Sequence, residues 1–388
     1  MRYWQGLVAA LVVCVPLPPG RAADAQETPC PRKAERSFDA GSTTVIKDGR
    51  PPCRIVYRKT GIRLEAVADG SRPDPGRTVL VDSNGRFISA NAPGWGVVIS
   101  VWDSRGRYMH SFGREGEGPG ELTARGMISM YIDGRDNLHV RDGGFRWSVF
   151  SPGHEFLRSA PAQVLGGASE QNTFILDDGS ALASDGYTRD RPHHFRVVDS
   201  TGALARTLGP ATSGLGGYLE RPISHAGGDS FWAAPPIEGP QEYVLEEWGL
   251  DGELRRAFRR DVSWYEWRGE QEISSAVSRL HATQDGLLYV VAPRPTEDFI
   301  KAYERPQHME GPYEDDEDSE IMELMEIVIE VIDTRSGELL ASDVFRVPEL
   351  METAAMELFR GSLRGYRYDV GDDGLPFVEI VDLELVPR

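Results

Sequence analysis

Short runs in which apolar and polar residues alternate fill the chain from about residue 53 to its end. They are joined by tight turns such as Asp-Ser-Asn-Gly at 82–85 and Asp-Ser-Arg-Gly at 103–106. Alternation with a period of two predicts β-strands, and turns of the Asp/Asn-Gly type predict that successive strands pair as antiparallel hairpins. The pattern therefore predicts antiparallel sheets of four strands each.

This four-strand unit recurs along the chain, which is the mark of a repeat architecture. Its copies occupy residues 78–113, 129–159, 173–209 and 223–258, then 278–291 continued at 327–345, and finally 365–388. One such sheet cannot bury both of its faces, whereas six sheets arranged radially cover one another. The sequence thus predicts an all-β protein, a six-bladed β-propeller of four-stranded antiparallel blades.

The last copy runs out of chain after about three strands, so its blade needs a strand from elsewhere. Residues 53–69, from Cys53 to Asp69, form a strand-like segment that no other copy uses. Pairing this segment with the C-terminal strand would close the ring and remove an exposed edge. We therefore expect residues 53–388 to form a single propeller domain closed by an N-terminal strand.

The first 25 residues have the three parts of a secretory signal peptide: basic Arg2, an apolar run from Leu7 to Val15, and Ala23-Asp24-Ala25 before a cleavage site. The apolar run is too short to span a bilayer. We expect cleavage after Ala25, a tail over residues 26–52, no membrane span, and a secreted or periplasmic location.

Removal of the signal peptide leaves two cysteines, Cys30 and Cys53. An even pair in an oxidising compartment favours a disulfide, which closes a loop of about 24 residues and stabilises by roughly 3 kcal/mol in the loop-entropy model. A zinc site is the weaker alternative, because nothing nearby supplies further ligands at zinc spacing. The predicted disulfide would pin the tail beside the ring closure.

The formal net charge is −19, and without the signal peptide 40 basic residues remain against 60 acidic ones. Such a surface repels phosphate backbones, so nucleic acid is not expected as a partner. Cations and basic partners stay open, and we expect a monomer.

A glycine-rich segment at 111–122, SFGREGEGPGEL, has the look of a phosphate-binding loop. A phosphate loop should open a helix, but this one leads into the next blade and carries Glu115, Glu117 and Glu121, which would repel an anion. We interpret the segment as a connection between blades.

The stretch VWDSRGRYMHSFGREGEGPGEL, followed by DGRDNLHVRDGGFRWSVFSPGHEFL, resembles consecutive blades of NHL-type six-bladed propellers. The resemblance covers residues 78–160 and rests on Asp142, Arg146 and Val149-Phe150, together with the Phe-Gly-x-x-Gly-x-Gly-x-Gly linker. It implies a propeller, and some six-bladed propellers are lactonases or amidating lyases.

The predicted connections are tight turns at one end of the ring and long loops at the other. We assign binding to the end with the long loops, because rigid scaffolds carry function on their loops. The longest detour, residues 292–326, contains the acidic run EDDEDSE. Its spacing does not fit an EF-hand, so a solvated acidic flap is favoured over a calcium site.

His225, His281 and Asp369 each stand four residues before a turn aspartate in successive copies, on the strands expected to be innermost. If they converge on the channel, they could hold a divalent metal such as Zn²⁺ or Ca²⁺, or act as acid and base. The alternative is a channel lined by hydrogen-bonded polar residues and water.

Two functions follow. One is a binding module for a protein, peptide or glycan on the long-loop face. The other is a metal-dependent hydrolase or lyase, lactonase-like or amidating-lyase-like, with its site in the channel.

Overall fold

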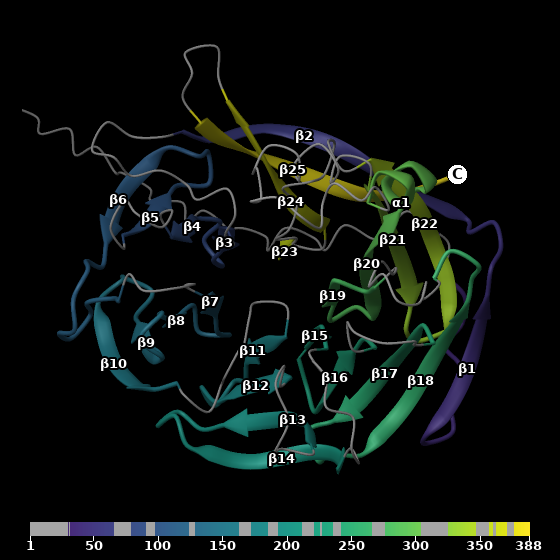
Figure 1. Cartoon of the computed structure of the whole chain (residues 1–388), viewed down its shortest axis with the longest axis horizontal. Coiled ribbons are helices and arrows are strands. Elements are labelled where there is room, and N and C mark those ends of the chain that lie inside the picture. The colour runs from purple at the N-terminus through teal and green to yellow at the C-terminus, as the bar shows by residue number, and fades with distance from the viewer. Residues whose placement is uncertain are drawn as a thin grey trace, which may run out of the picture.

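The protein is described by a computed structural model that covers residue 30 and residues 32–65, 79–90, 98–123, 129–162, 172–184, 193–211, 221–225, 227–235, 242–265, 276–303, 325–346, 357–359, 362–370 and 376–388. Within these residues the strands form six sheets arranged as a ring (Figure 1). The predicted six-bladed propeller is therefore confirmed. The predicted signal peptide, residues 1–25, lies outside the described residues.

The first three blades coincide with the first three predicted copies. Blade 1 contains β3 (Val79–Val81), β4 (Phe87–Ala90), β5 (Ile99–Trp102) and β6 (Tyr108–Phe112). Blade 2 contains β7 (Ser129–Ile132), β8 (Leu138–Arg141), β9 (Arg146–Phe150) and β10 (Phe156–Pro161). Blade 3 contains β11 (Thr173–Ile175), β12 (Ala181–Ser184), β13 (His193–Val198) and β14 (Leu204–Ala211).

The other three blades include every departure from the simple repeat. Blade 4 contains β15 (Ile223–Ser224), β16 (Ser230–Ala233), β17 (Val244–Gly249) and β18 (Leu254–Asp261). Blade 5 contains β19 (Arg279–Ala282), β20 (Leu287–Pro295), β21 (Met325–Asp333) and β22 (Glu338–Arg346). Blade 6 contains β23 (Glu357–Phe359), β24 (Ser362–Val370), β25 (Pro376–Pro387) and β2 (Cys53–Glu65).

Several of the tight turns share one local design, which explains why they could be predicted from the sequence. In the turn after β5, the Asp103 carboxylate accepts hydrogen bonds from the backbone N–H groups of Arg105 and Arg107. The third residue after the aspartate, Gly106, has a left-handed φ of 81°. This conformation favours glycine, and an Asx side chain fixes the start of the turn. Equivalent aspartates stand at Asp82 and Asp199.

The apolar core lies between the blades. The described residues form six buried clusters, and each cluster draws its members from two adjacent sheets. Between blades 1 and 2, for example, Ile99 packs with Met130 and Val140, all at most 1% exposed. Each blade thus covers its neighbour, as the radial arrangement predicts.

Blade 6 is closed by the N-terminal segment, as expected. Strand β2 pairs antiparallel with β25, so that Cys53 lies opposite Pro387. One detail of the prediction is wrong: the last copy was taken to begin at Gly365, but its innermost strand is β23, which ends at Phe359. Gly365 and Asp369 belong to β24, the second strand of the blade.

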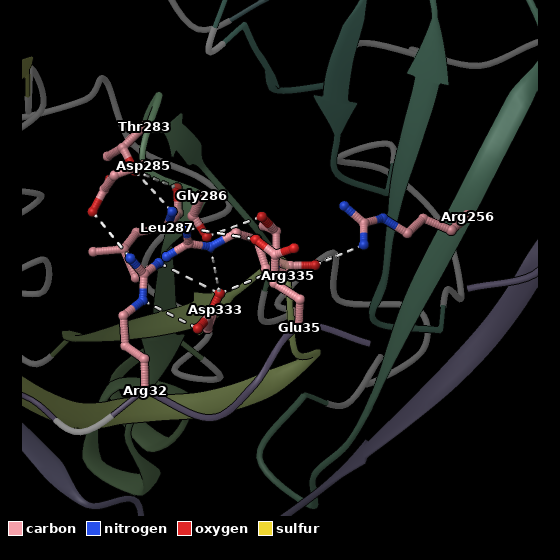
Figure 2. A network of polar contacts seen from close by, with 10 residues as sticks. Arg32, Glu35, Arg256, Thr283, Asp285, Gly286, Leu287, Asp333 and Arg335 are labelled. Atoms are coloured by element: carbon pink, nitrogen blue, oxygen red, sulfur yellow. Dashed lines mark hydrogen bonds and ion pairs between the residues drawn. The ribbon is translucent and has the colours of Figure 1, made fainter. Parts of the chain in front are cut away.

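The tail has structure that the sequence did not reveal. Strand β1 (Ser42–Lys47) pairs parallel with β18 and gives the sheet of blade 4 a fifth strand. The predicted disulfide is confirmed, with the Cα atoms of Cys30 and Cys53 6.1 Å apart. The tail crosses blade 5 between these points, where the Arg32 guanidinium lies between the carboxylates of Asp285 and Asp333 at 3.2 and 3.1 Å (Figure 2).

The glycine-rich loop is organised around a cation rather than an anion. The Arg146 side chain donates hydrogen bonds to the backbone oxygens of Gly116, Glu117 and Glu121, and also to the Asp142 carboxylate. Carbonyl oxygens that point at an arginine cannot cradle a phosphate, which needs N–H groups. This geometry supports the interpretation of the loop as a connection between blades 1 and 2.

Among the helices within the described residues, none combines the length and the apolar character that a membrane crossing requires.

Candidate functional site

A cavity opens at the long-loop end of the ring, at the junction of blades 4 and 5. It has a volume of about 380 Å³ and is formed by the segment leading into β17 and the segment leaving β18. The lining residues are Glu242, Tyr243, Arg259, Arg260, Asp261, Val262 and Tyr265. Cavities of this size hold small ligands or single side chains of a larger one.

One wall of the cavity is aromatic. The rings of Tyr243 and Tyr265 stack with centroids 4.7 Å apart, and Trp264 meets both of them edge-on. Tyr243 is buried, while Trp264 and Tyr265 are half-buried. Burial raises the pKa of Tyr265 to about 12, although a hydrogen bond from the Val277 backbone acts to lower the pKa. The wall therefore stays neutral at ordinary pH and offers ring faces to apolar or sugar groups.

The floor of the cavity is a buried ion pair that joins two blades. The Glu330 carboxylate of β21 accepts hydrogen bonds from Arg260 Nε at 2.8 Å, Arg260 Nη2 at 2.7 Å and the Tyr243 hydroxyl at 2.9 Å. Arg260 Nη1 donates to the backbone oxygen of Ile46 in β1 at 2.6 Å. The floor is therefore fixed by blade 4, blade 5 and the tail together.

These contacts also set the charge of the floor. Burial works against the charged form of Arg260, but the hydrogen bonds and charge of Glu330 outweigh it, so the pKa of Arg260 lies above its usual range. Burial, followed by the negative charge of Glu330, raises the pKa of Tyr243 well above its usual range. The floor thus holds one cation, one anion and one neutral phenol, with no net charge.

The rim supplies the polar groups that a ligand could contact. The Glu242 and Arg259 side chains are 72% and 45% exposed and lie 3.8 Å apart at their charged ends. An exposed pair of this kind is weakly held, so either partner can turn towards a ligand. Sequence reasoning missed these residues, although Trp264-Tyr265 directly after a strand was a signal that could have indicated them.

His225 lies just after the innermost strand of blade 4 and faces blade 3. Its ring stacks on Phe174 of β11 with centroids 4.8 Å apart and an interplanar angle of 2°. Its Nε2 atom lies 3.3 Å from the Gly228 backbone oxygen. These contacts hold the imidazole against the neighbouring blade.

His281 lies on β19, the innermost strand of blade 5, and faces blade 6. It is directly opposite Tyr289, which packs in the cluster between blades 5 and 6, whereas the alternate residues Leu280 and Ala282 pack towards blade 4. Burial, followed by the charge of Arg279, lowers the pKa of His281 to about 3. Its Nε2 atom is buried and has no hydrogen-bond partner among the described residues.

The two imidazoles contact different blades, because His225 packs against blade 3 and His281 faces blade 6. Asp369 is on β24, opposite Phe377, and its side chain lies outside the described part of the structure. Within the described ranges, no group of three His, Cys, Asp or Glu side chains could hold a metal ion. A metal at His225, His281 or Asp369 stays a prediction.

The predicted acidic insertion joins β20 to β21 at the long-loop end. Strand β20 continues to Pro295, and helix α1 (Glu297–Tyr303) follows, with Thr296 Oγ1 accepting a hydrogen bond from the Phe299 N–H. The EDDEDSE run lies outside the described residues. Its interpretation as a solvated flap stays a prediction.

Comparison with known proteins shows the fold. No protein-family model matches the chain, and no curated protein sequence matches it. A crystal structure from Bacteroides fragilis NCTC 9343, of a protein described as exported, is similar with a TM-score of 0.56 and 11% sequence identity, covering 88% of this chain and 99% of that one. The extracellular domain of a one-component system protein from B. thetaiotaomicron gives a TM-score of 0.43 at 12% identity, covering 84% of this chain and 42% of that one. The NHL type suggested by the linker motif is matched by no family model and stays a prediction.

Proposed function

We propose that the protein is an exported binding module that holds a protein, peptide or glycan at the long-loop end of its ring. The observation that carries this proposal is the aromatic-walled cavity around Tyr243 and Tyr265. Its wall and floor are fixed by strands of two blades, while its rim presents exposed polar groups. Preformed concave sites that combine an aromatic wall with convergent polar groups are a usual form of ligand sites.

The chemistry of the cavity suggests how a ligand is held. The neutral Tyr265 ring suits stacking against a sugar ring or an apolar side chain, and Glu242 and Arg259 can hydrogen-bond hydroxyl or peptide groups. The similarity to a protein described as exported agrees with the location inferred from the first 25 residues.

The test begins with residues 26–388 applied to immobilised neutral oligosaccharides and to short peptides. For whatever is retained, Tyr265→Ala and Arg259→Ala should each weaken binding by about tenfold, the effect of losing a well-placed contact. Arg107→Ala is the matched control, because this arginine is 73% exposed and forms a similar surface pair with Asp103 at the opposite end of the ring. Equal binding by the cavity variants and the control would refute the proposal.

The alternative of a metal-dependent hydrolase or lyase in the channel also remains open. Metal analysis of the purified protein decides it, because such an enzyme carries a bound divalent ion held by about three protein ligands.

A further inference from the structure

A second concave surface lies between the tail and blade 5, next to the cavity described above, because strand β1, which lines it, pairs with β18. It is a groove of about 630 Å³. Its lining combines basic side chains, the strand β1, a Pro-Pro segment and the start of β22: Arg32, Lys33, Arg36, Thr44, Val45, Ile46, Lys47, Gly49, Arg50, Pro51, Pro52, Gly337, Glu338 and Leu339.

The walls of this groove are held in place from both sides. One wall is fixed by Arg32, whose guanidinium binds Asp285 and Asp333 (Figure 2), and by the Arg36 N–H, which donates to the Arg335 oxygen at 3.0 Å. The other wall is fixed at Pro52, whose backbone oxygen accepts a hydrogen bond from the Arg388 N–H at 2.9 Å. The disulfide between Cys30 and Cys53 ties the two walls together. The groove is therefore preformed.

A free strand edge lines the groove. Strand β1 is the outermost strand of its sheet, and its second edge pairs with no described strand. Arg260 N–H donates to the Tyr243 oxygen, so Arg260 faces β17 and its neighbour Arg259 faces β1. In the parallel register Thr44 lies opposite Phe258, between Ala257 and Arg259, so its backbone bonds β18. Since alternate residues of a strand point to opposite edges, the N–H and C=O of Val45 are directed away from β18. An edge of this kind can take up another extended chain.

The groove is basic on a chain whose net charge is −19. Five of its lining side chains are cationic and one, Glu338, is acidic. Arg32 and Lys33 already bind carboxylates. Arg36, Lys47 and Arg50 are exposed and have no ion-pair partner among the described residues. Exposed cations in a concave surface attract anionic groups.

Apolar surface lies between these cations. Val45 is 41% exposed, and Leu339 is partly exposed beside it in the lining. Val45 and Lys47 share one face of β1, because they are two residues apart on a strand. A partner here would meet a backbone edge, an apolar strip and positive charges at the same time.

We propose that this groove binds an extended acidic peptide segment, which adds to the free edge of β1 as a further strand. The backbone groups of Val45 would pair with the peptide backbone, and Lys47, Arg50 and Arg36 would bind its carboxylates. This surface adjoins the long-loop cavity through β1, but the proposal does not rest on the function proposed for that cavity.

The test uses fluorescein-labelled octapeptides and the anisotropy that they show with residues 26–388. A peptide of alternating Glu and Val should bind, and a peptide of alternating Lys and Val should not. A peptide of alternating Glu and Pro carries the same charge, but proline fixes φ at about −65° and keeps the peptide out of the conformation of a paired strand, so it should bind at least about tenfold more weakly.

Variants locate the binding. Lys47→Glu with Arg50→Glu should weaken binding of the Glu/Val peptide by at least about tenfold, because two charge-assisted contacts become repulsive. Arg105→Glu with Arg135→Glu is the matched control, since both arginines are exposed, lie on blades 1 and 2, and give the same change in net charge. This control should bind as the unmodified protein does.

Val45→Pro tests the strand edge in the protein, since it removes one outward N–H and leaves the pairing of β1 with β18 in place. Its melting temperature reports whether β1 has survived the change. Equal binding by the Lys47/Arg50 variant and the control variant would overturn the proposal. If the Glu/Val and Glu/Pro peptides bound equally, the groove would bind by charge attraction alone and the proposed strand pairing would be overturned. Heparin that bound as well as the Glu/Val peptide would lead to the same conclusion.

Discussion

The buried pair of Arg260 and Glu330 gives the sharpest prediction for stability, and Glu330→Gln is the change that tests it. Both side chains are at most 1% exposed. Glutamine keeps the size of the side chain, but it removes the carboxylate charge that binds the guanidinium. It also places an N–H₂ group where Arg260 and Tyr243 donate hydrogen bonds.

The size of the effect follows from this burial. Removing one partner of a buried ion pair typically destabilises by about 3–5 kcal/mol, because the other charge is left uncompensated. With ~2.1 cal/mol/K of unfolding entropy per residue, a chain of 388 residues has about 0.8 kcal/mol/K in total. The melting temperature should therefore fall by about 4–6 °C.

Thermal unfolding followed by circular dichroism measures this shift, and two further variants interpret it. Glu384→Gln removes a carboxylate from the pair with Arg58, whose side chains are 59% and 38% exposed, and it should lower stability by less than about 1 kcal/mol. Arg260→Met combined with Glu330→Leu should recover most of the loss, because no buried charge remains. Equal melting temperatures of the Glu330→Gln and Glu384→Gln proteins would refute the reasoning.

Three other predictions concern pH, a turn and the ring closure. Burial, with the charge of Arg86, lowers the pKa of His154 to about 4, below the ~6.5 of an unfolded chain, so stability should fall as the pH drops from about 6.5 to 4. Melting temperatures of His154→Asn should depend less on pH in that range. Gly106→Ala should cost more than about 2 kcal/mol by denaturant unfolding, since φ is 81° and the new Cβ would overlap the Arg63 backbone oxygen, whereas Gly228→Ala, with φ of 84° and open space, should cost about 1 kcal/mol. Deleting residues 26–70 should expose the edge of β25 and cause aggregation in light scattering, and a monomer that melts unchanged would contradict the closure.

The sequence was sufficient for the blades because their signals are local. Several tight turns are specified by an aspartate that accepts hydrogen bonds from the N–H groups two and four residues on, as Asp82 and Asp103 do. Ser151 and Thr283 hold the same place in two other turns. Alternation then fixes which side chains enter the clusters between blades. The closing strand could also be predicted, since β2 was the one unassigned run at the opposite end of the chain.

The strands that were missed lack such signals. Strand β23 has three residues, too few to show alternation, and this caused β24 to be taken for the innermost strand. Strand β1 pairs parallel with β18, so no hairpin turn in the sequence indicates this pairing. Both depend on contacts between segments far apart in the sequence.

The candidate site residues were harder still to predict. His225 and His281 occupy similar offsets before a turn, but β15 has two residues and ends before His225, whereas β19 includes His281. A shift of one residue reverses the face that a side chain occupies, which is why the two imidazoles point to different neighbours. The cavity residues Tyr243 and Tyr265 come from the segment before β17 and the segment after β18, which approach because these two strands pair in blade 4.

The tail connects the two proposed binding surfaces. The Ile46 backbone oxygen accepts a hydrogen bond from Arg260 in the floor of the cavity, while the same strand forms a wall of the groove with Thr44 and Lys47. A chain truncated to start at Cys53 would lose the disulfide, the groove and one support of the cavity floor at once. Loss of ligand binding in such a truncation would therefore not distinguish the two surfaces, and only point variants such as Arg259→Ala and Lys47→Glu, in a chain that begins at residue 26, can separate them.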